Sequence, residues 1–170
     1  MKLNLNELDN IKKIAEVSTP VYDIKTVKEN TLSAPKWLHF GAGNIFRAYV
    51  GKMQQNLLNK GLENTGIIVA ESFDGEIIDK AYKPYDNLTL SVTLSKDGNF
   101  STELIASIVE SLKANVDREK LKEIVVQPTL QMISFTITEK GYNLKSSTGE
   151  YIQIIKDDFN SSPDLSLIHI

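Results

Sequence analysis

Two glycines, Gly41 and Gly43, follow an apolar run at residues 37–40, and a segment with helical spacing begins directly after them. The first glycine allows a tight turn, and the second lets the backbone approach a phosphate without an intervening Cβ. The start of the next helix adds N–H donors and a positive dipole end. We therefore predict a pyrophosphate-binding turn, as in dinucleotide sites. The predicted contacts are Gly41, Ala42, Gly43, Asn44, Ile45, Phe46 and Arg47.

This glycine motif is incomplete. A third small residue is usual three positions after the second glycine, and Phe46 stands there. Arg47 lies about one turn into the predicted helix, from where its guanidinium could reach a phosphate or ribose; an exposed helix arginine is the alternative. The position of the turn between a strand and a helix, more than the two glycines, favours the dinucleotide interpretation.

A carboxylate at the end of the second predicted strand could bind the adenosine ribose. Dinucleotide sites place an acidic side chain there, and it favours NAD because it would repel the 2′-phosphate of NADP. Asp74 is the first candidate and Glu71 the second. The alternative for Asp74 is a solvated turn in which it caps a helix starting at Gly75.

Further candidates lie in two other strands. Thr138, at the end of a strand predicted over 132–138, is a predicted cofactor contact, and Glu139 is a predicted substrate-pocket residue. A plain strand-end charge is the alternative for Glu139. His39 lies inside the first strand, where we expect a buried, hydrogen-bonded core histidine. No Ser/His/Asp arrangement and no metal-ligand spacing is present.

Alternating strand and helix patterns position these residues. A strand at 36–40, a helix at about 44–60 and a strand at 66–70 form a βαβ unit with parallel strands. The predicted fold class is α/β: a partial Rossmann-like, doubly wound, mainly parallel sheet with flanking helices. The further predicted elements are a strand at 88–95, a tight turn at 96–99, and helices at 102–113 and 117–126.

We predict three parts along the chain. Residues 1–33 form a helical lead-in with Asn6 as a plausible N-cap, and residues 34–163 form an incomplete NAD-binding domain whose end, after Gly141, is polar and loop-like. Residues 164–170 form a non-native tail. Its last six residues, LSLIHI, are what one reading frame of a common transposon-sequencing adapter encodes; a genuine apolar C-terminus is the alternative.

Composition excludes several classes of protein. The net charge of −3 gives no electrostatic case for nucleic acid or an anionic membrane. The absence of cysteine rules out disulfides and thiolate chemistry and suits a cytoplasmic protein. No apolar run approaches the roughly 20 residues of a membrane helix. We expect a cytoplasmic protein with no nucleic-acid, membrane or metal partner.

Several segments resemble one enzyme family. His39–Tyr49, HFGAGNIFRAY, is similar to the first strand and glycine turn of the polyol-specific long-chain dehydrogenases, the mannitol dehydrogenase and fructuronate reductase family. Ile45 stands where Phe is usual, and Phe46 and Tyr49 stand where many members carry histidines. Ile133–Tyr142, ISFTITEKGY, resembles a second family motif. Weaker likenesses at 85–88 and 105–112 extend the resemblance over about residues 35–145.

The resemblance implies NAD(P)-dependent interconversion of a secondary alcohol and a ketone on a polyol or sugar acid. In that family a lysine acts as general acid/base within a Lys-x-x-x-x-Asn-x-x-His pattern of a second, helical domain. Lys156 lacks the asparagine and histidine, so the chain resembles the cofactor half, and we expect it to be inactive alone. Alternatives are a tagaturonate reductase or mannitol-1-phosphate 5-dehydrogenase fragment, a non-catalytic nucleotide-binding module, or a domain for another nucleotide.

Overall fold

The computed structural model describes residues 2–137 and 143–160. The chain divides into two compact units, Met1–Phe135 and Thr136–Ile170. The tail predicted at 164–170 lies outside the described residues, as do the predicted site residues Thr138 and Glu139.

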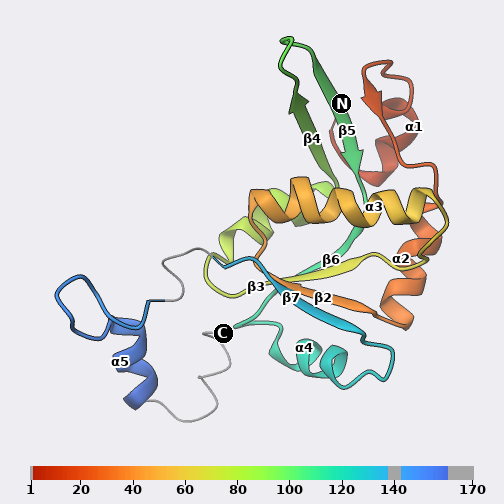
Figure 1. Ribbon diagram of the computed structural model, residues 1–170. Coiled ribbons are helices and arrows are strands. Elements are labelled where there is room, and N and C mark those ends of the chain that lie inside the picture. Colours follow the sequence, from red (N-terminus) through yellow and green to blue (C-terminus); the bar gives the residue numbers. More distant parts are fainter. Residues whose placement is uncertain (1, 138–142, 161–170) are drawn as a thin grey trace. The chain divides into compact units, whose positions relative to one another are not determined.

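A four-stranded parallel sheet forms the centre of the first unit (Figure 1). Its strand order is β6 (Ile108–Lys113), β3 (Ile67–Glu71), β2 (Trp37–Phe40) and β7 (Met132–Phe135). Because β2 and β3 are central and later strands flank them on either side, the sheet is wound in both directions from β2, as in a Rossmann fold. The predicted α/β class and the three predicted parallel strands are confirmed.

Helices cover both faces of this sheet (Figure 1). On one face, Phe46 of η2 (Phe46–Val50) and Tyr82 of η3 (Ile78–Tyr82) pack on Ile67 and Val69. On the other face, α4 (Arg118–Val125) packs Leu121 and Ile124 against the sheet. Strand β3 is buried on both faces, which explains its uninterrupted apolar sequence.

The helix predicted at 44–60 is present and starts directly after the glycine turn. Its first turn closes where the Arg47 N–H donates to the Gly43 carbonyl at 3.1 Å, and it continues through η2, a π-helical turn, into α3 (Gly51–Asn59). Gly61, with φ +65°, ends it: the Leu62 N–H donates back to the Leu57 carbonyl at 3.0 Å. Gly61 is therefore the C′ residue of this helix.

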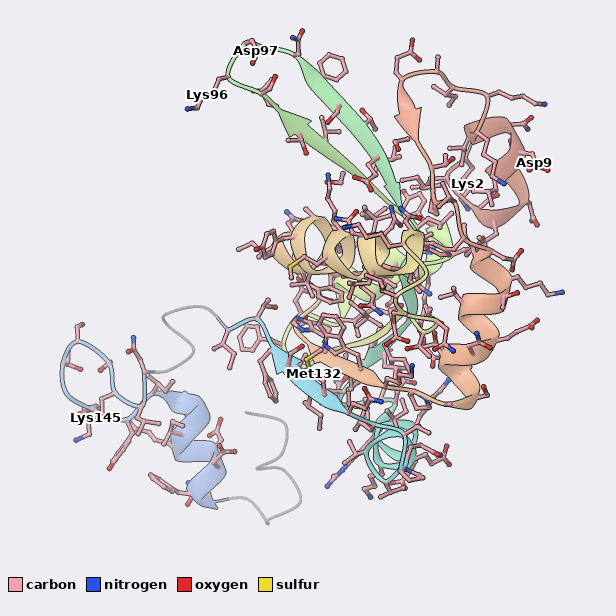
Figure 2. The ribbon with its side chains drawn as sticks, turned by 45° about the vertical axis from the view of Figure 1, so that its right-hand side comes forward. Lys2, Asp9, Lys96, Asp97, Met132 and Lys145 are labelled. Atoms are coloured by element: carbon pink, nitrogen blue, oxygen red, sulfur yellow. The ribbon has the colours of Figure 1, made fainter. Side chains whose placement is uncertain are left out.

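A second, three-stranded sheet has the order β1 (Val17–Ser18), β5 (Phe100–Ile105) and β4 (Thr89–Leu94). Strands β4 and β5 form an antiparallel hairpin, with the predicted tight turn closed by the Ser95 N–H on the Asn99 carbonyl at 2.8 Å. Lys96 and Asp97 lie at its tip (Figure 2). The short η4 (Lys83–Tyr85) leads from η3 towards β4.

The helix predicted at 102–113 is wrong, because this segment forms the end of β5 and all of β6. Its apolar pairs, at 104–105 and 108–109, imitate a helix face since all four residues are buried and do not alternate with exposed ones. Gln55 of α3 fixes the break between the strands: its Oε1 accepts the Ala106 N–H at 2.8 Å, and its Nε2 donates to the Leu104 carbonyl at 2.8 Å.

The strand predicted at 132–138 is confirmed as β7, and an apolar sequence of this kind would suit a buried strand, but β7 is only partly buried. Met132, Ile133 and Phe135 are 43%, 42% and 41% exposed. Strand β7 is the sheet edge among the described residues and pairs only with β2, so its apolar sequence is only half covered. Met132 marks the start of this strand in Figure 2.

The N-terminal segment folds differently from the prediction in two ways. Asn4, rather than Asn6, caps its first turn, because the Asn4 side chain accepts the Glu7 N–H at 3.0 Å. A helix that the sequence analysis missed, α2 (Ile24–Ser33), is capped by Asp23, whose Oδ1 accepts the Thr26 N–H at 2.6 Å. The remaining elements of this segment are η1 (Leu5–Glu7) and α1 (Leu8–Ile11).

The second unit is more regular than the loop that its polar sequence predicts. Its described residues contain the helix α5 (Gln153–Asn160) and a β-bridge between Lys145 and Tyr151. The rings of Tyr151 and Phe159 pack edge to face with centroids 5.3 Å apart. This aromatic pair joins the bridge to the helix in a segment with little apolar sequence.

Candidate functional site

The glycine turn lies at the carboxyl end of β2, where parallel α/β sheets bind ligands. Gly41 has φ +106°, a conformation that glycine adopts at little cost, and its N–H donates to the Ala70 carbonyl at 2.8 Å. A Cβ added to Gly43 would meet no atom within 4 Å, so this side of the turn is open. The N–H groups of Asn44, Ile45 and Phe46 follow in the first helical turn, before the first helical hydrogen bond closes at Arg47.

Glu71, the last residue of β3, lies against this turn. Its Oε2 accepts the Ala42 N–H at 2.7 Å. Its Oε1 accepts the Phe73 and Asp74 N–H groups at 2.9 and 3.2 Å. Three main-chain donors therefore hold one carboxylate beside the predicted phosphate site, which brings two of the sequence-predicted segments together.

Asp74 occupies a different position. Its Oδ1 accepts the Glu76 N–H at 3.2 Å, and its carbonyl accepts the Ile77 N–H at 3.2 Å. These are the contacts of a residue that caps a following helix, the alternative stated for it from the sequence. Asp74 is exposed and is joined to the glycine turn through Glu71.

Arg47 lies on the helix side, next to the hairpin. Its guanidinium donates to Asn44 Oδ1 and, at 3.5 Å, to Thr89 Oγ1 of β4, and it lies 5.6 Å from the ring centre of Tyr82. Its Nε is buried without a hydrogen-bond partner in the part of the chain that the structure describes. Arg47 and Thr89 also line a hollow of about 390 Å³ beside η3.

Two side chains that the sequence analysis did not select contact the turn and the strand before it. The Tyr82 hydroxyl donates to the Ala42 carbonyl at 2.7 Å, and burial raises the pKa of this phenol. Ser134 of β7 lies 2.7 Å from His39 Nδ1. Neither residue carries a sequence signal, because both contacts arise from strands and helices that pack only in the folded chain.

The expectation for His39 is confirmed: it is 1% exposed and hydrogen-bonded within the core. Among the described residues, no group of three or more acidic, histidine or cysteine side chains could hold a metal ion. Within the same residues, no helix has the length and apolar character needed to cross a bilayer.

Comparison with known proteins identifies the class. The doubly wound parallel sheet with a glycine turn at its carboxyl end defines a Rossmann-type domain. Residues 35–166 match the family described as the mannitol dehydrogenase Rossmann domain, and the chain belongs to this family. The resemblance inferred from the glycine turn is confirmed.

Two curated relatives show how far the similarity extends. The D-mannonate oxidoreductase of Thermotoga maritima is 49% identical over 150 residues, covering 86% of this chain and 28% of the relative. The polyol:NADP oxidoreductase of Gluconobacter oxydans is 28% identical over 141 residues, covering 81% of this chain and 27% of the relative. The chain therefore spans little more than a quarter of the length of these relatives.

A solved structure has the same fold. The ternary complex of Pseudomonas fluorescens mannitol 2-dehydrogenase with NAD and D-mannitol superposes with a TM-score of 0.73 at 26% identity. It covers 94% of this chain, and this chain covers 32% of it. The predicted cofactor, NAD, is the cofactor in that complex.

Proposed function

We propose that this chain is the cofactor-binding part of an NAD-dependent oxidoreductase that interconverts a secondary alcohol and a ketone on a polyol or sugar acid. Membership of the mannitol dehydrogenase family supports the reaction class. The short span of the chain relative to its relatives supports catalytic residues outside it, and hence inactivity of the chain alone. Its cytoplasmic location stays a prediction.

The observation that carries this proposal is the contact between the Glu71 carboxylate and the Ala42 N–H, beside the open face of Gly43. A dinucleotide requires main-chain donors for its pyrophosphate and, within reach, a carboxylate for the adenosine ribose. Both groups are present here at one strand edge. Bound NAD would supply the hydride chemistry, while the residues of this chain bind and orient it.

We assign the ribose contact to Glu71 ahead of Asp74. The Glu71 carboxylate is fixed beside the glycine turn by three N–H donors, whereas the Asp74 carboxylate caps the next helix. A negative charge at this position disfavours the 2′-phosphate of NADP, so the proposed cofactor is NAD. Arg47 ranks below the main-chain donors, because a phosphate contact requires it to leave Asn44 and Thr89.

For the substrate, we favour a sugar acid over an uncharged polyol. The relative at 49% identity is named for D-mannonate, whereas the relative named for polyols is 28% identical. A fructuronate reductase type is therefore our preferred function, with a mannitol dehydrogenase type second. Thr138 and Glu139 stay predicted cofactor and substrate-pocket residues.

The test is a titration of the 170-residue chain with NADH and NADPH. Trp37 is the only tryptophan in the sequence and lies in β2, so quenching of its fluorescence reports binding. We expect NADH to bind more tightly than NADPH. Gly43→Val fills the open face of the turn and should weaken NADH binding at least roughly 100-fold, about 2.7 kcal/mol.

Glu71→Gln and Asp74→Asn form a matched pair, because each removes one negative charge with little change of shape. We expect Glu71→Gln to reduce the ratio of the NADPH and NADH dissociation constants roughly tenfold. This factor corresponds to about the free energy of one charge-assisted hydrogen bond. Asp74→Asn should leave the preference within about twofold. Selective binding of another nucleotide by the wild-type chain would overturn the proposed function, and the reverse ranking of the variants would move the ribose contact to Asp74.

A further inference from the structure

Phe46 replaces the third small residue of the glycine motif, and its ring is fully buried. It stacks on the imidazole of His39, with ring centroids 4.2 Å apart and planes 10° apart. In a standard glycine motif the third glycine permits close packing of helix and strand. Here an aromatic–imidazole stack makes that contact, and it places a polar ring directly beneath the glycine turn.

The hydrogen-bond partners of the His39 ring indicate which of its two nitrogens carries the proton. Trp37 Nε1, which can only donate, lies 2.7 Å from Ser134 Oγ, so this hydroxyl accepts from it. Because a hydroxyl has two acceptor sites, the direction of the 2.7 Å bond between Ser134 Oγ and His39 Nδ1 depends on the tautomer of the ring, and we assign Nδ1 as the acceptor. With Nδ1 as acceptor, the neutral ring carries its proton on Nε2. The ring also makes a backbone hydrogen bond with Gly41, whose N–H is already donated to Ala70, so Nε2–H donates to the Gly41 carbonyl.

The next carbonyl along the chain is held in the same way. The hydroxyl of Tyr82, 1% exposed, donates to the Ala42 carbonyl at 2.7 Å. Two buried side chains from different elements therefore hold the carbonyls of Gly41 and Ala42, one after the other.

The direction of these carbonyls determines the direction of the N–H groups. In a trans peptide the C=O and the following N–H point in opposite directions. A Gly41 carbonyl held by His39 directs the Ala42 N–H away from the core, where it meets the Glu71 carboxylate at 2.7 Å. An Ala42 carbonyl held by Tyr82 likewise directs the Gly43 N–H away from the core, towards the open face of that glycine.

We propose that His39 and Tyr82 are positioning residues of the glycine turn. Tyr82, through the Ala42 carbonyl, aims the Gly43 N–H at the cofactor pyrophosphate, and His39, through the Gly41 carbonyl, aims the Ala42 N–H at the Glu71 carboxylate beside it. They do not touch the cofactor themselves and act through the two carbonyls. This inference rests on the proposed NAD site, but its effect on the N–H groups exists before any ligand binds. Substitution of a buried side chain that does not touch the cofactor should therefore change phosphate recognition.

The cleanest test is Tyr82→Phe, which removes only the hydroxyl, with Tyr49→Phe as the matched control. Tyr49 lies in η2, in the helix that follows the glycine turn, and is 65% exposed. His39→Phe keeps an aromatic ring against Phe46 and removes both hydrogen bonds. We expect Tyr82→Phe and His39→Phe each to weaken NADH binding roughly tenfold, and Tyr49→Phe to leave it within about twofold.

Two readouts separate positioning from a general loss of structure. Adenosine lacks the pyrophosphate, so its affinity should change less than about twofold in Tyr82→Phe, although this variant loses tenfold for NADH. Without any ligand, amide hydrogen exchange at Ala42, whose N–H is held by Glu71, should accelerate in both variants and stay unchanged in Tyr49→Phe. Unchanged exchange, or equal losses for adenosine and NADH, would overturn the positioning role. Altered exchange in a chain that binds no NADH would instead leave the positioning of the turn intact and reject the cofactor.

Discussion

The parallel sheet and the hairpin sheet of the first unit use apolar residues in opposite ways. In β3 of the parallel sheet, Ile67–Ala70 are all buried, between helices on both faces. In β4 of the hairpin sheet, Thr89 and Ser91 are buried, while Leu90, Val92 and Leu94 are 48%, 63% and 74% exposed. Since alternate strand residues face opposite sides, the hairpin has its polar side inward.

The parallel sheet is packed on both faces, whereas the hairpin sheet contributes few packing contacts to the unit. Among the described residues, the apolar cluster of the hairpin sheet lies near its base, where Leu88, Leu104 and Ala106 pack on Ile11 and the N-terminal segment. Its distal part has no apolar cluster among the described residues. The glycine turn stands on the parallel sheet, so the precision of the candidate site derives from the well-packed half of the unit.

The largest expected effect is the contrast between a core truncation in each sheet. Ile68→Ala opens a cavity at a residue that is 1% exposed, and we expect a loss of about 2–5 kcal/mol in the free energy of unfolding. Val92→Ala, at 63% exposure in β4, should change it by less than about 0.5 kcal/mol. Urea unfolding followed by circular dichroism measures both, and similar losses for the two variants would contradict the comparison.

The sequence predicted the elements with local signals and failed where an element depends on distant contacts. The unit from β2 to β3 was predictable because its signals are local: an apolar run, two glycines, a helical period and a closing glycine at Gly61. The helix over 102–113 was mispredicted because β6 gains its strand identity from pairing with β3, a contact distant in sequence. Periodicity alone does not separate a doubly buried strand from a helix.

The site was predictable in kind and less so in detail. The turn at Gly41–Gly43 and the neighbouring acidic segment meet as expected, but Glu71, the second candidate, is the carboxylate that contacts the turn, and Asp74, the first candidate, caps the next helix. Which of two nearby carboxylates faces the turn depends on where β3 ends, and strand ends are poorly defined by sequence. Tyr82 reaches the turn, and Ser134 reaches His39, only through tertiary packing, so no local pattern marks them.

An intermediate effect should appear on acidification, and it belongs to the parallel sheet. Burial lowers the pKa of His39 from 6.5 to about 4. Below pH 6.5 the unfolded chain binds a proton at this residue that the folded chain does not bind, so stability falls as the pH falls. The loss accumulates between pH 6.5 and about 4 and reaches roughly 3 kcal/mol, at 1.36 kcal/mol per pKa unit.

Carboxylates affect the free energy of unfolding at lower pH than His39 does. The pKa of Glu63 is lowered below its ordinary 4.5, despite desolvation, by hydrogen bonds from Lys36 and nearby N–H groups, so its contribution is lost only below about pH 4.5. His39→Phe should therefore flatten the pH dependence of the free energy of unfolding above pH 4.5 and keep it below. Urea unfolding at half-unit pH intervals measures this dependence. If the free energy of unfolding of the variant still falls with pH above pH 4.5, the pH dependence belongs to another group.

The smallest expected effect on stability comes from the exposed side of the hairpin, where Leu94→Lys should change the free energy of unfolding by less than about 0.5 kcal/mol. Its effect on association should be larger. Leu90, Val92 and Leu94 form an apolar row on one side of β4, and exposed apolar patches drive contacts between copies. We expect Leu94→Lys to reduce concentration-dependent self-association in sedimentation velocity, with Lys96→Leu, at the polar tip, as the opposite control. Equal sedimentation of all three chains would mean that the inverted polarity of the hairpin has no consequence for association, and the contrast between the two sheets would then concern packing alone.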